Sequence, residues 1–179
     1  MNDRFNYRLS ESKKKDIAEN LIDILTIDAK ITEATRGFIS NWLCTGPDEK
    51  RKAFFDVWDI VLKNYMPTER PILFRSCERI GRKNKIASFT GRLECARRFG
   101  NGQDYLLICD TKEELELVEQ YYKKGEYIRT FYPLGKVLVK ARDKGGCGFS
   151  ERTWSFIGED EYIMRINVGN INKLKWVTM

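Results

Sequence analysis

The spacing of hydrophobic residues changes at Pro71, and this change constrains the fold more than any other feature of the chain. Before Pro71, apolar residues recur at helical spacing in three segments, residues 10–30, 32–44 and 48–66. After Pro71, they occur in short runs typical of strands, at residues 72–74, 105–109, 127–132, 136–141, 161–168 and 174–179. Helices first and strands later predict an α+β fold.

The helical segments carry local signals that begin and end helices. Thr32 can cap the second helix, and Pro67 ends the third. The inward side chains of these helices would form a small core, and no motif in this part of the chain indicates a catalytic site. We therefore expect a helical layer over residues 1–66, followed by a mixed β core over residues 67–179 that forms one compact unit.

The second half of the chain also contains segments that are not expected to be strands. Residues 112–124 have the apolar spacing of a helix. Residues 143–148 (DKGGCG) are rich in residues that tolerate positive φ, and they predict a turn. This turn is expected to lead into a loop at residues 149–158, which carries Trp154 and Phe156.

The composition is that of a folded protein with an excess of positive charge. Hydrophobic residues make up 42% of the 179 residues, enough for a sizeable core. The formal net charge of +6 permits an acidic partner such as nucleic acid, but the basic residues are scattered apart from short runs at 13–15 and 50–52. We expect no membrane partner, because no apolar segment is long enough to span a bilayer and the first residues lack a signal-peptide core.

The chain contains no histidine, which limits its chemistry. Catalytic Ser-His and Cys-His pairs and every histidine general base are excluded. The five cysteines are widely spaced and form no C-x-x-C motif, so we expect no metal site and a reducing, cytoplasmic location. Proton transfer would have to use carboxylates, lysine, tyrosine or cysteine.

A strand that turns into a helix at residues 86–99 (IASFTGRLECARRF) carries two hydroxyl groups at its turning point. Ser88 and Thr90 are two residues apart at the end of the expected strand, so their side chains point to the same side. Thr90 is also an N-cap candidate for the following helix. The apolar residues of that helix lie at helical spacing: Leu93, Ala96 and Phe99.

Charged residues upstream and downstream of this stretch are further candidates. Arg75 follows a short apolar strand, and its guanidinium suits a pyrophosphate; the alternative is a surface residue that caps the sheet. Glu159 and Glu161 are two residues apart on an expected extended segment, so they would face the same way. Such a pair suits a reaction through a cation, where one carboxylate stabilises the positive charge and the other accepts a proton. The alternative is a solvated strand entry.

Three motifs in this order resemble those of the ADP-ribosyltransferases of the arginine–serine–glutamate type. They are the aromatic–arginine pair at 74–75, the Ser-x-Thr motif at 88–90 followed by A-x-x-F, and the Glu-x-Glu motif at 159–161. The resemblance covers about residues 70–168, and a helical layer ahead of such a core resembles the small phage and bacterial-effector members. The chain differs from the family in Ser76, where a glycine often follows the arginine, and in Gly91, where a second polar residue is frequent.

The resemblance implies a mono-ADP-ribosyltransferase that uses NAD as co-substrate and no metal. Arg75 would hold the diphosphate, and Ser88 would orient Glu161. Glu161 would stabilise the cation as nicotinamide leaves, and Glu159 would polarise the incoming nucleophile. The residues expected to contact NAD are Arg75, Ser76, Ser88, Thr90 and Glu161.

The resemblance also bears on the acceptor of ADP-ribose. Glutamate at position 159 resembles the arginine-modifying members, so we expect transfer to arginine of a target protein. The loop ahead of the Glu-x-Glu motif would contact that target through Trp154 and Phe156, which are alternatively core aromatics. Two alternatives remain open: modification of a nucleic-acid base, and a non-enzymatic basic domain that binds nucleic acid or a host protein. The sequence shows no stripe of aromatic and basic residues that such a domain would need.

Overall fold

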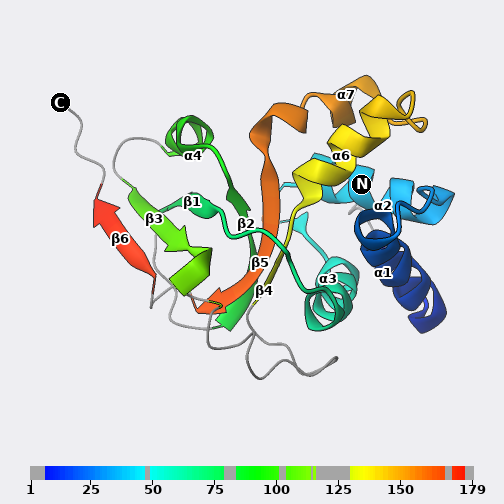
Figure 1. Cartoon of the computed structure of the whole chain (residues 1–179), viewed down its shortest axis with the longest axis horizontal. Helices are drawn as coiled ribbons and strands as arrows, with labels where there is room; N and C mark the ends of the chain where they lie inside the picture. The colour runs from blue at the N-terminus through cyan, green and yellow to red at the C-terminus, as the bar shows by residue number, and fades with distance from the viewer. Residues whose placement is uncertain are drawn as a thin grey trace, which may run out of the picture. The chain divides into compact units, whose positions relative to one another are not determined.

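The computed structural model describes residues 7–46, 49–78, 84–100, 104–113, 115, 130–167 and 171–175. The fold is α+β, as predicted, with helices in the N-terminal part and all six described strands after them (Figure 1). The chain divides into two compact units. The first comprises Met1–Val61 and Val137–Ile157, and the second comprises Leu62–Lys136 and Gly158–Met179. This division differs from the expected one, because residues 137–157 belong with the N-terminal helices.

The first unit is helical. It contains α1 (Glu11–Thr26), α2 (Glu33–Cys44), most of α3 (Lys52–Asn64), most of α6 (Leu134–Asp143) and the short α7 (Glu151–Trp154). The predicted cap of α2 is present, since the hydroxyl of Thr32 accepts a hydrogen bond from the backbone amide of Thr35. Ser10 caps α1 in the same way through the amide of Lys13.

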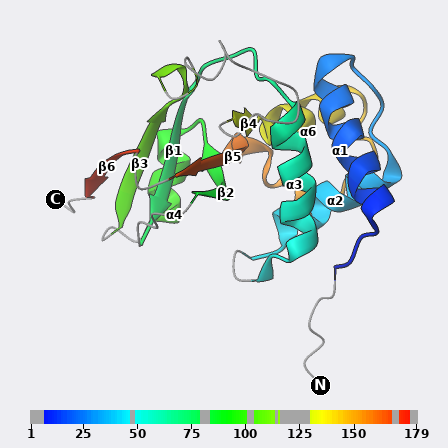
Figure 2. The same cartoon turned by 90° about the horizontal axis from the view of Figure 1, so that it is seen from below.

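Aromatic side chains fill the core of the first unit. The helices α1, α2 and α3 lie side by side (Figure 2). The rings of Trp42 and Trp58 meet edge to face with centroids 5.6 Å apart, and Phe38 packs against Trp58 at 5.2 Å. Such edge-to-face pairs add to the free energy that burial of the rings provides.

Two segments of the first unit differ from the sequence prediction. Residues 136–141, expected to be a strand, belong to the helix α6, with Val137, Leu138 and Ala141 buried and Val139 37% exposed. A short apolar run fits a strand and a helix equally well, and burial with a helical period decides it here. The expected loop at 149–158 is also largely helical, because it contains α7 and the start of a 3₁₀ turn.

The turn predicted between these segments is present. Gly145, Gly146, Cys147 and Gly148 all have positive φ. The glycines adopt this conformation without the steric cost that a side chain brings, which explains why the chain can reverse here after α6.

The second unit is built on one sheet. Its strands are β1 (Ile72–Cys77), β2 (Asn84–Thr90), β3 (Tyr105–Asp110), β4 (Thr130–Tyr132), β5 (Glu161–Asn167) and β6 (Asn172–Lys175). Their order is β4-β5-β2-β1-β3-β6, and all neighbours are antiparallel. The strand β2 therefore lies between β1 and β5 (Figure 1).

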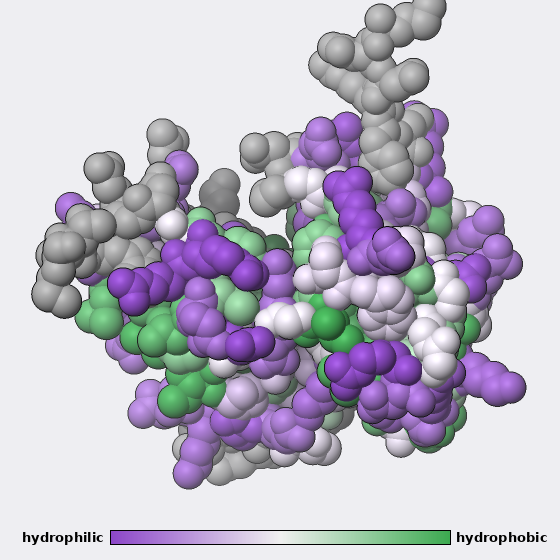
Figure 3. Space-filling view, turned by 90° about the horizontal axis from the view of Figure 1, so that it is seen from above, coloured by the Kyte–Doolittle hydropathy of each residue, from purple (hydrophilic) through white to green (hydrophobic). Residues whose placement is uncertain are grey.

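One face of this sheet forms the core of the second unit, with buried Leu73, Phe89, Leu107 and Met164 among its members. The helix α4 (Leu93–Phe99) contributes less than its apolar spacing suggests. Of the three apolar residues at helical spacing only Ala96 is buried, because Leu93 is 44% and Phe99 57% exposed. On the face presented in Figure 3, hydrophobic residues lie interspersed with hydrophilic ones.

Several expected elements extend beyond the described residues. Most of the helix expected at 112–124 lies outside them, as do residues 127–129 and 176–179. Among the helices that are described, none has the length and apolar character needed to cross a bilayer.

Candidate active site

Three neighbouring strands carry the predicted site residues: Arg75 on β1, Ser88 and Thr90 on β2, and Glu161 on β5. The strand β2 pairs with β5 along its whole length, from Asn84 opposite Asn167 to Thr90 opposite Glu161. Residues directly opposite each other in an antiparallel pair have their side chains on the same face. Thr90, Glu161 and Ser88, two residues along from Thr90, therefore share one face of the sheet.

A hydrogen bond joins the two central residues of this face. The Ser88 hydroxyl donates to Glu161 Oε1 at 2.6 Å. A hydrogen bond from a hydroxyl to a carboxylate is shorter and stronger than one between two neutral groups. This bond therefore fixes the rotamer of Glu161. The structure thus brings together two residues that are 73 positions apart in the chain.

Arg75 lies where β1 and β2 separate. The two strands have a single registered pair, Phe74 opposite Thr90. Just beyond it, Nη1 of Arg75 donates to the carbonyl oxygen of Ser88 at 2.6 Å and so bridges the strands with a side chain instead of the backbone. Arg75 Nε is buried and has no hydrogen-bond partner within the described residues.

Burial of the Arg75 guanidinium lowers its pKa, while the nearby Cys77 thiol and Glu161 carboxylate act in the opposite direction. Arg75 and Glu161 are therefore electrostatically coupled. A buried cationic donor without a partner is costly, and an anion that reached this nitrogen would offset the cost.

Ser76 uses its side chain within the protein. Its hydroxyl donates to the carbonyl oxygen of Ala96 at 2.8 Å and so links β1 to α4. The expectation that Ser76 contacts NAD stays a prediction.

Thr90 does not cap α4, contrary to the prediction. The N-cap of α4 is Arg92, without a side-chain capping bond. The Thr90 hydroxyl accepts from the backbone amide of Arg92 at 3.0 Å and donates to the carbonyl oxygen of Glu159 at 2.5 Å. The helix begins later than the spacing indicated because Thr90 is still the last residue of β2.

The residues Thr90, Gly91 and Arg92 hold the turn that carries Glu159; we call them the 90–92 clamp. Besides the Thr90 bond, the amide of Gly91 donates to the carbonyl of Asp160 at 3.1 Å, and Arg92 Nη1 donates to the carbonyl of Gly158 at 2.9 Å. Three consecutive carbonyl groups, at 158, 159 and 160, are thus each bound by one residue of the clamp.

The two glutamates are arranged differently from the prediction. Glu159 ends a 3₁₀ turn, η2 (Ile157–Glu159), and Asp160 has a left-handed φ of 46°, whereas Glu161 begins β5. Glu159 and Glu161 are therefore not residues i and i+2 of one strand, and strand alternation does not place them on the same face. The clamp and the left-handed residue, rather than strand alternation, set the direction of Glu159.

The two carboxylates nevertheless influence each other. Burial raises the pKa of Glu159, the charge of Glu161 raises it further, and Arg98 lowers it. Nη2 of Arg98 lies 3.4 Å from Glu159 Oε1. Glu159 is thus a partly buried carboxylate beside a second acid and in contact with a guanidinium.

The clamp explains why glycine occupies position 91. A Cβ at Gly91 would lie 2.1 Å from Asp160 Oδ2, and a Cβ at Gly135 would lie 3.1 Å from the same side chain. The Asp160 carboxyl therefore fills the space that two glycines leave. In the sequence Gly91 is only a departure from the family pattern, and Asp160, Arg92 and Arg98 carry no signal of their own. The glycine itself indicates a close approach.

We expect Gly91→Ala to destabilise the protein by about 1–3 kcal/mol, the usual cost of overpacking. The free energy of unfolding, measured in urea, tests this. Adding Asp160→Gly should restore much of the loss, because glycine removes the clash and adopts the left-handed φ easily. Gly37→Ala is the matched control: its Cβ would contact nothing within 4 Å, so α2 should be unaffected or slightly stabilised. Equal destabilisation by both alanines would contradict the close contact of Gly91 with Asp160.

Trp154 and Phe156 belong to the first unit, whereas Arg75, Ser88, Glu159 and Glu161 belong to the second. Trp154 packs edge to face against Phe149, with centroids 5.4 Å apart. This contact favours the core alternative for Trp154.

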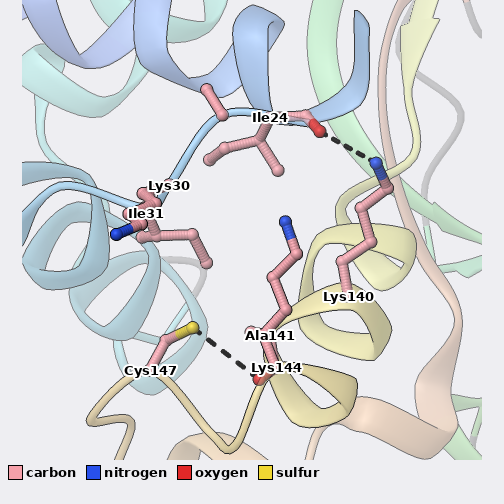
Figure 4. Close-up of a pocket in the computed structure, with 8 residues that line it drawn as sticks. Ile24, Lys30, Ile31, Lys140, Ala141, Lys144 and Cys147 are labelled. Atoms are coloured by element: carbon pink, nitrogen blue, oxygen red, sulfur yellow. Dashed lines mark hydrogen bonds between the residues drawn. The ribbon is translucent and has the colours of Figure 1, made fainter. Parts of the chain in front are cut away.

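The first unit contains a cavity of about 280 Å³ that none of the predicted site residues lines (Figure 4). Two of its three lysines contact groups of the protein: Lys140 donates to the carbonyl of Ile24, and Lys140 and Lys144 both pair with Asp28. These lysines, Lys144 first, lower the pKa of Asp28 to about 2. Both lysines already contact the carboxylate of Asp28, so their presence in the lining does not by itself indicate a ligand. No three His, Cys, Asp or Glu side chains of the described residues are grouped so that they could hold a metal ion.

Comparison of the chain with protein-family models, with curated proteins and with solved structures finds no match.

Proposed function

We propose that the protein is a mono-ADP-ribosyltransferase that cleaves NAD, releases nicotinamide and transfers ADP-ribose to arginine of a target protein. The observation that carries the proposal is the hydrogen bond from Ser88 to Glu161, with Arg75 bound to the backbone of the same serine. Three residues that the family resemblance selects from distant parts of the chain thus meet at one place.

In this proposal Glu161 stabilises the positive charge that develops on the ribose as nicotinamide leaves. A fixed carboxylate is effective because it needs no rearrangement while the charge develops. Ser88 keeps it fixed by donating to Oε1. The chain has no histidine for this chemistry, so the carboxylates are the natural groups to perform it.

Arg75 is proposed to bind the diphosphate of NAD. The buried and unpartnered Nε supports this role, because a phosphate oxygen would supply the missing acceptor.

Glu159 is proposed to bind the acceptor arginine and to take up its proton. The guanidinium of Arg98 already contacts this carboxylate, which supports a site that accepts guanidinium groups.

We expect Arg75→Lys to weaken NAD binding about 10-fold or more. A hydrogen bond to a charged group is worth about 1.5–3 kcal/mol, and lysine cannot donate the two parallel hydrogen bonds that a guanidinium gives to a phosphate. Isothermal titration calorimetry measures the effect. Arg36→Lys, at a partly buried arginine of the first unit that also donates to a backbone carbonyl, is the matched control and should bind NAD like the parent protein. Unchanged affinity in Arg75→Lys would exclude Arg75 from the NAD site.

The proposed function itself is tested with NAD labelled in its adenosine part. The purified protein is incubated with a lysate, nicotinamide is quantified, and the labelled macromolecule is identified. Nicotinamide release together with label on arginine of a protein is the expected result. Label on nucleic acid would redirect the proposal to a base as acceptor, and absence of nicotinamide release would reject it. We further propose a cytoplasmic site of action, within a host cell if the protein is an effector.

A further inference from the structure

An arginine of the protein itself contacts the carboxylate that the proposed function assigns to the acceptor. Nη2 of Arg98 lies 3.4 Å from Glu159 Oε1, and the Arg98 side chain is 63% exposed. Arg98 lies in the last turn of α4, next to Phe99, with its guanidinium carbon 5.3 Å from the centre of that ring. The guanidinium of Arg98 therefore contacts Glu159 and remains accessible to solvent.

We propose that Arg98 occupies the acceptor position and is itself ADP-ribosylated, within the same molecule, when no target protein is bound. This inference rests on the proposed function and adds a named modification site to it. It also implies competition, because a target arginine can contact Glu159 only after Arg98 has moved away. An exposed ion pair is weak enough for a target to displace it.

Neighbouring arginines lack this arrangement. Arg92 Nε and Nη2 bind the carboxylate of Glu94, and its Nη1 donates to the carbonyl of Gly158, so its guanidinium is part of the clamp. Arg97 is exposed and has no ion pair with a carboxylate of the described residues. Of the arginines on and next to α4, Arg98 is the one that contacts Glu159.

NAD is the second reactant of the proposed step. The bond between C1′ of the ribose and the nicotinamide nitrogen breaks, and its electron pair leaves with nicotinamide. A terminal nitrogen of Arg98 forms a new bond to C1′ and gives up one proton, which Glu159 accepts. The products are nicotinamide and ADP-ribosyl-Arg98, and the proton is later released to water.

The test uses the purified full-length protein with NAD and no other macromolecule. Nicotinamide is quantified, and modified arginines are located by mass spectrometry with electron-transfer fragmentation. We expect ADP-ribose on Arg98, with a rate per molecule that does not depend on protein concentration, as a reaction within one molecule requires. The Arg98→Lys variant should lose this label, whereas Arg97→Lys, the matched control, should keep it.

A second measurement uses agmatine, a small guanidine, as external acceptor. Arg98→Lys is expected to lower the KM for agmatine by removing the internal guanidinium, and Arg97→Lys is not. Nicotinamide release with label only on other residues would overturn the inference and leave the proposed function in place. Label on Arg98 whose rate per molecule rises with protein concentration would overturn the intramolecular reaction. No nicotinamide release would overturn both.

Discussion

Replacing Glu161 by glutamine should reduce NAD cleavage by about 10²–10³-fold, the range found when an enzyme loses one group that stabilises a developing charge. Glutamine keeps the shape of glutamate, and its amide oxygen can still accept the hydrogen bond from Ser88, so the fold should survive. What is lost is the negative charge opposite the cationic ribose. Nicotinamide release, measured at saturating NAD, quantifies this loss, and thermal unfolding checks the fold.

The control for this variant is Glu113→Gln, which changes an exposed glutamate of the same unit and alters the net charge equally. It should cleave NAD like the parent protein. If Glu161→Gln also cleaved NAD at nearly the parent rate, the transferase proposal would be refuted, since no other described carboxylate is bonded to Ser88.

Replacing Glu159 by glutamine should separate the two halves of the reaction. In the proposed mechanism the cleavage of NAD depends on Glu161, and water can capture the cation with little assistance, so nicotinamide release should largely remain. Transfer to arginine should fall steeply, because a guanidinium is protonated at neutral pH and needs a carboxylate that binds it and accepts its proton. Both quantities can be measured in one sample, as nicotinamide and as label on the acceptor.

The pKa of Glu159 provides a second measurement of the same role. Burial first, and the charge of Glu161 next, raise this pKa. Glu159 must be ionised to accept a proton, so transfer should decline on acidification at a higher pH than an ordinary glutamate would cause. Parallel loss of cleavage and transfer in Glu159→Gln would assign Glu159 to NAD binding or folding. Full retention of both would point to an acceptor other than arginine.

The family resemblance, rather than physical reasoning about single residues, selected the residues that meet in the sheet. Alternation on a strand predicted that Ser88 and Thr90 share a face, and the register confirms it. It did not predict that Glu161 lies on the strand next to them, because the pairing of β2 with β5 joins segments more than 70 residues apart. The same alternation failed for Glu159, since a 3₁₀ turn and a left-handed Asp160 precede the strand.

The sequence by itself determined those features whose causes lie within a few residues of one another. These are the appearance of strands after Pro71, the cap at Thr32 and the positive-φ turn at residues 143–148. Each depends on local backbone and side-chain chemistry, so it can be predicted from residues that are neighbours in the sequence.

The tertiary structure alone decided which side chains meet across the chain. It made residues 136–141 a helix, left Leu93 and Phe99 exposed, and packed the carboxyl of Asp160 against Gly91. These outcomes depend on the shape and polarity of distant segments, and short apolar runs or single glycines are compatible with several such environments. The contact between Arg98 and Glu159 is of the same kind. The two charged residues come together, as the proposed acceptor and its carboxylate, only because the 90–92 clamp holds α4 against the η2 turn.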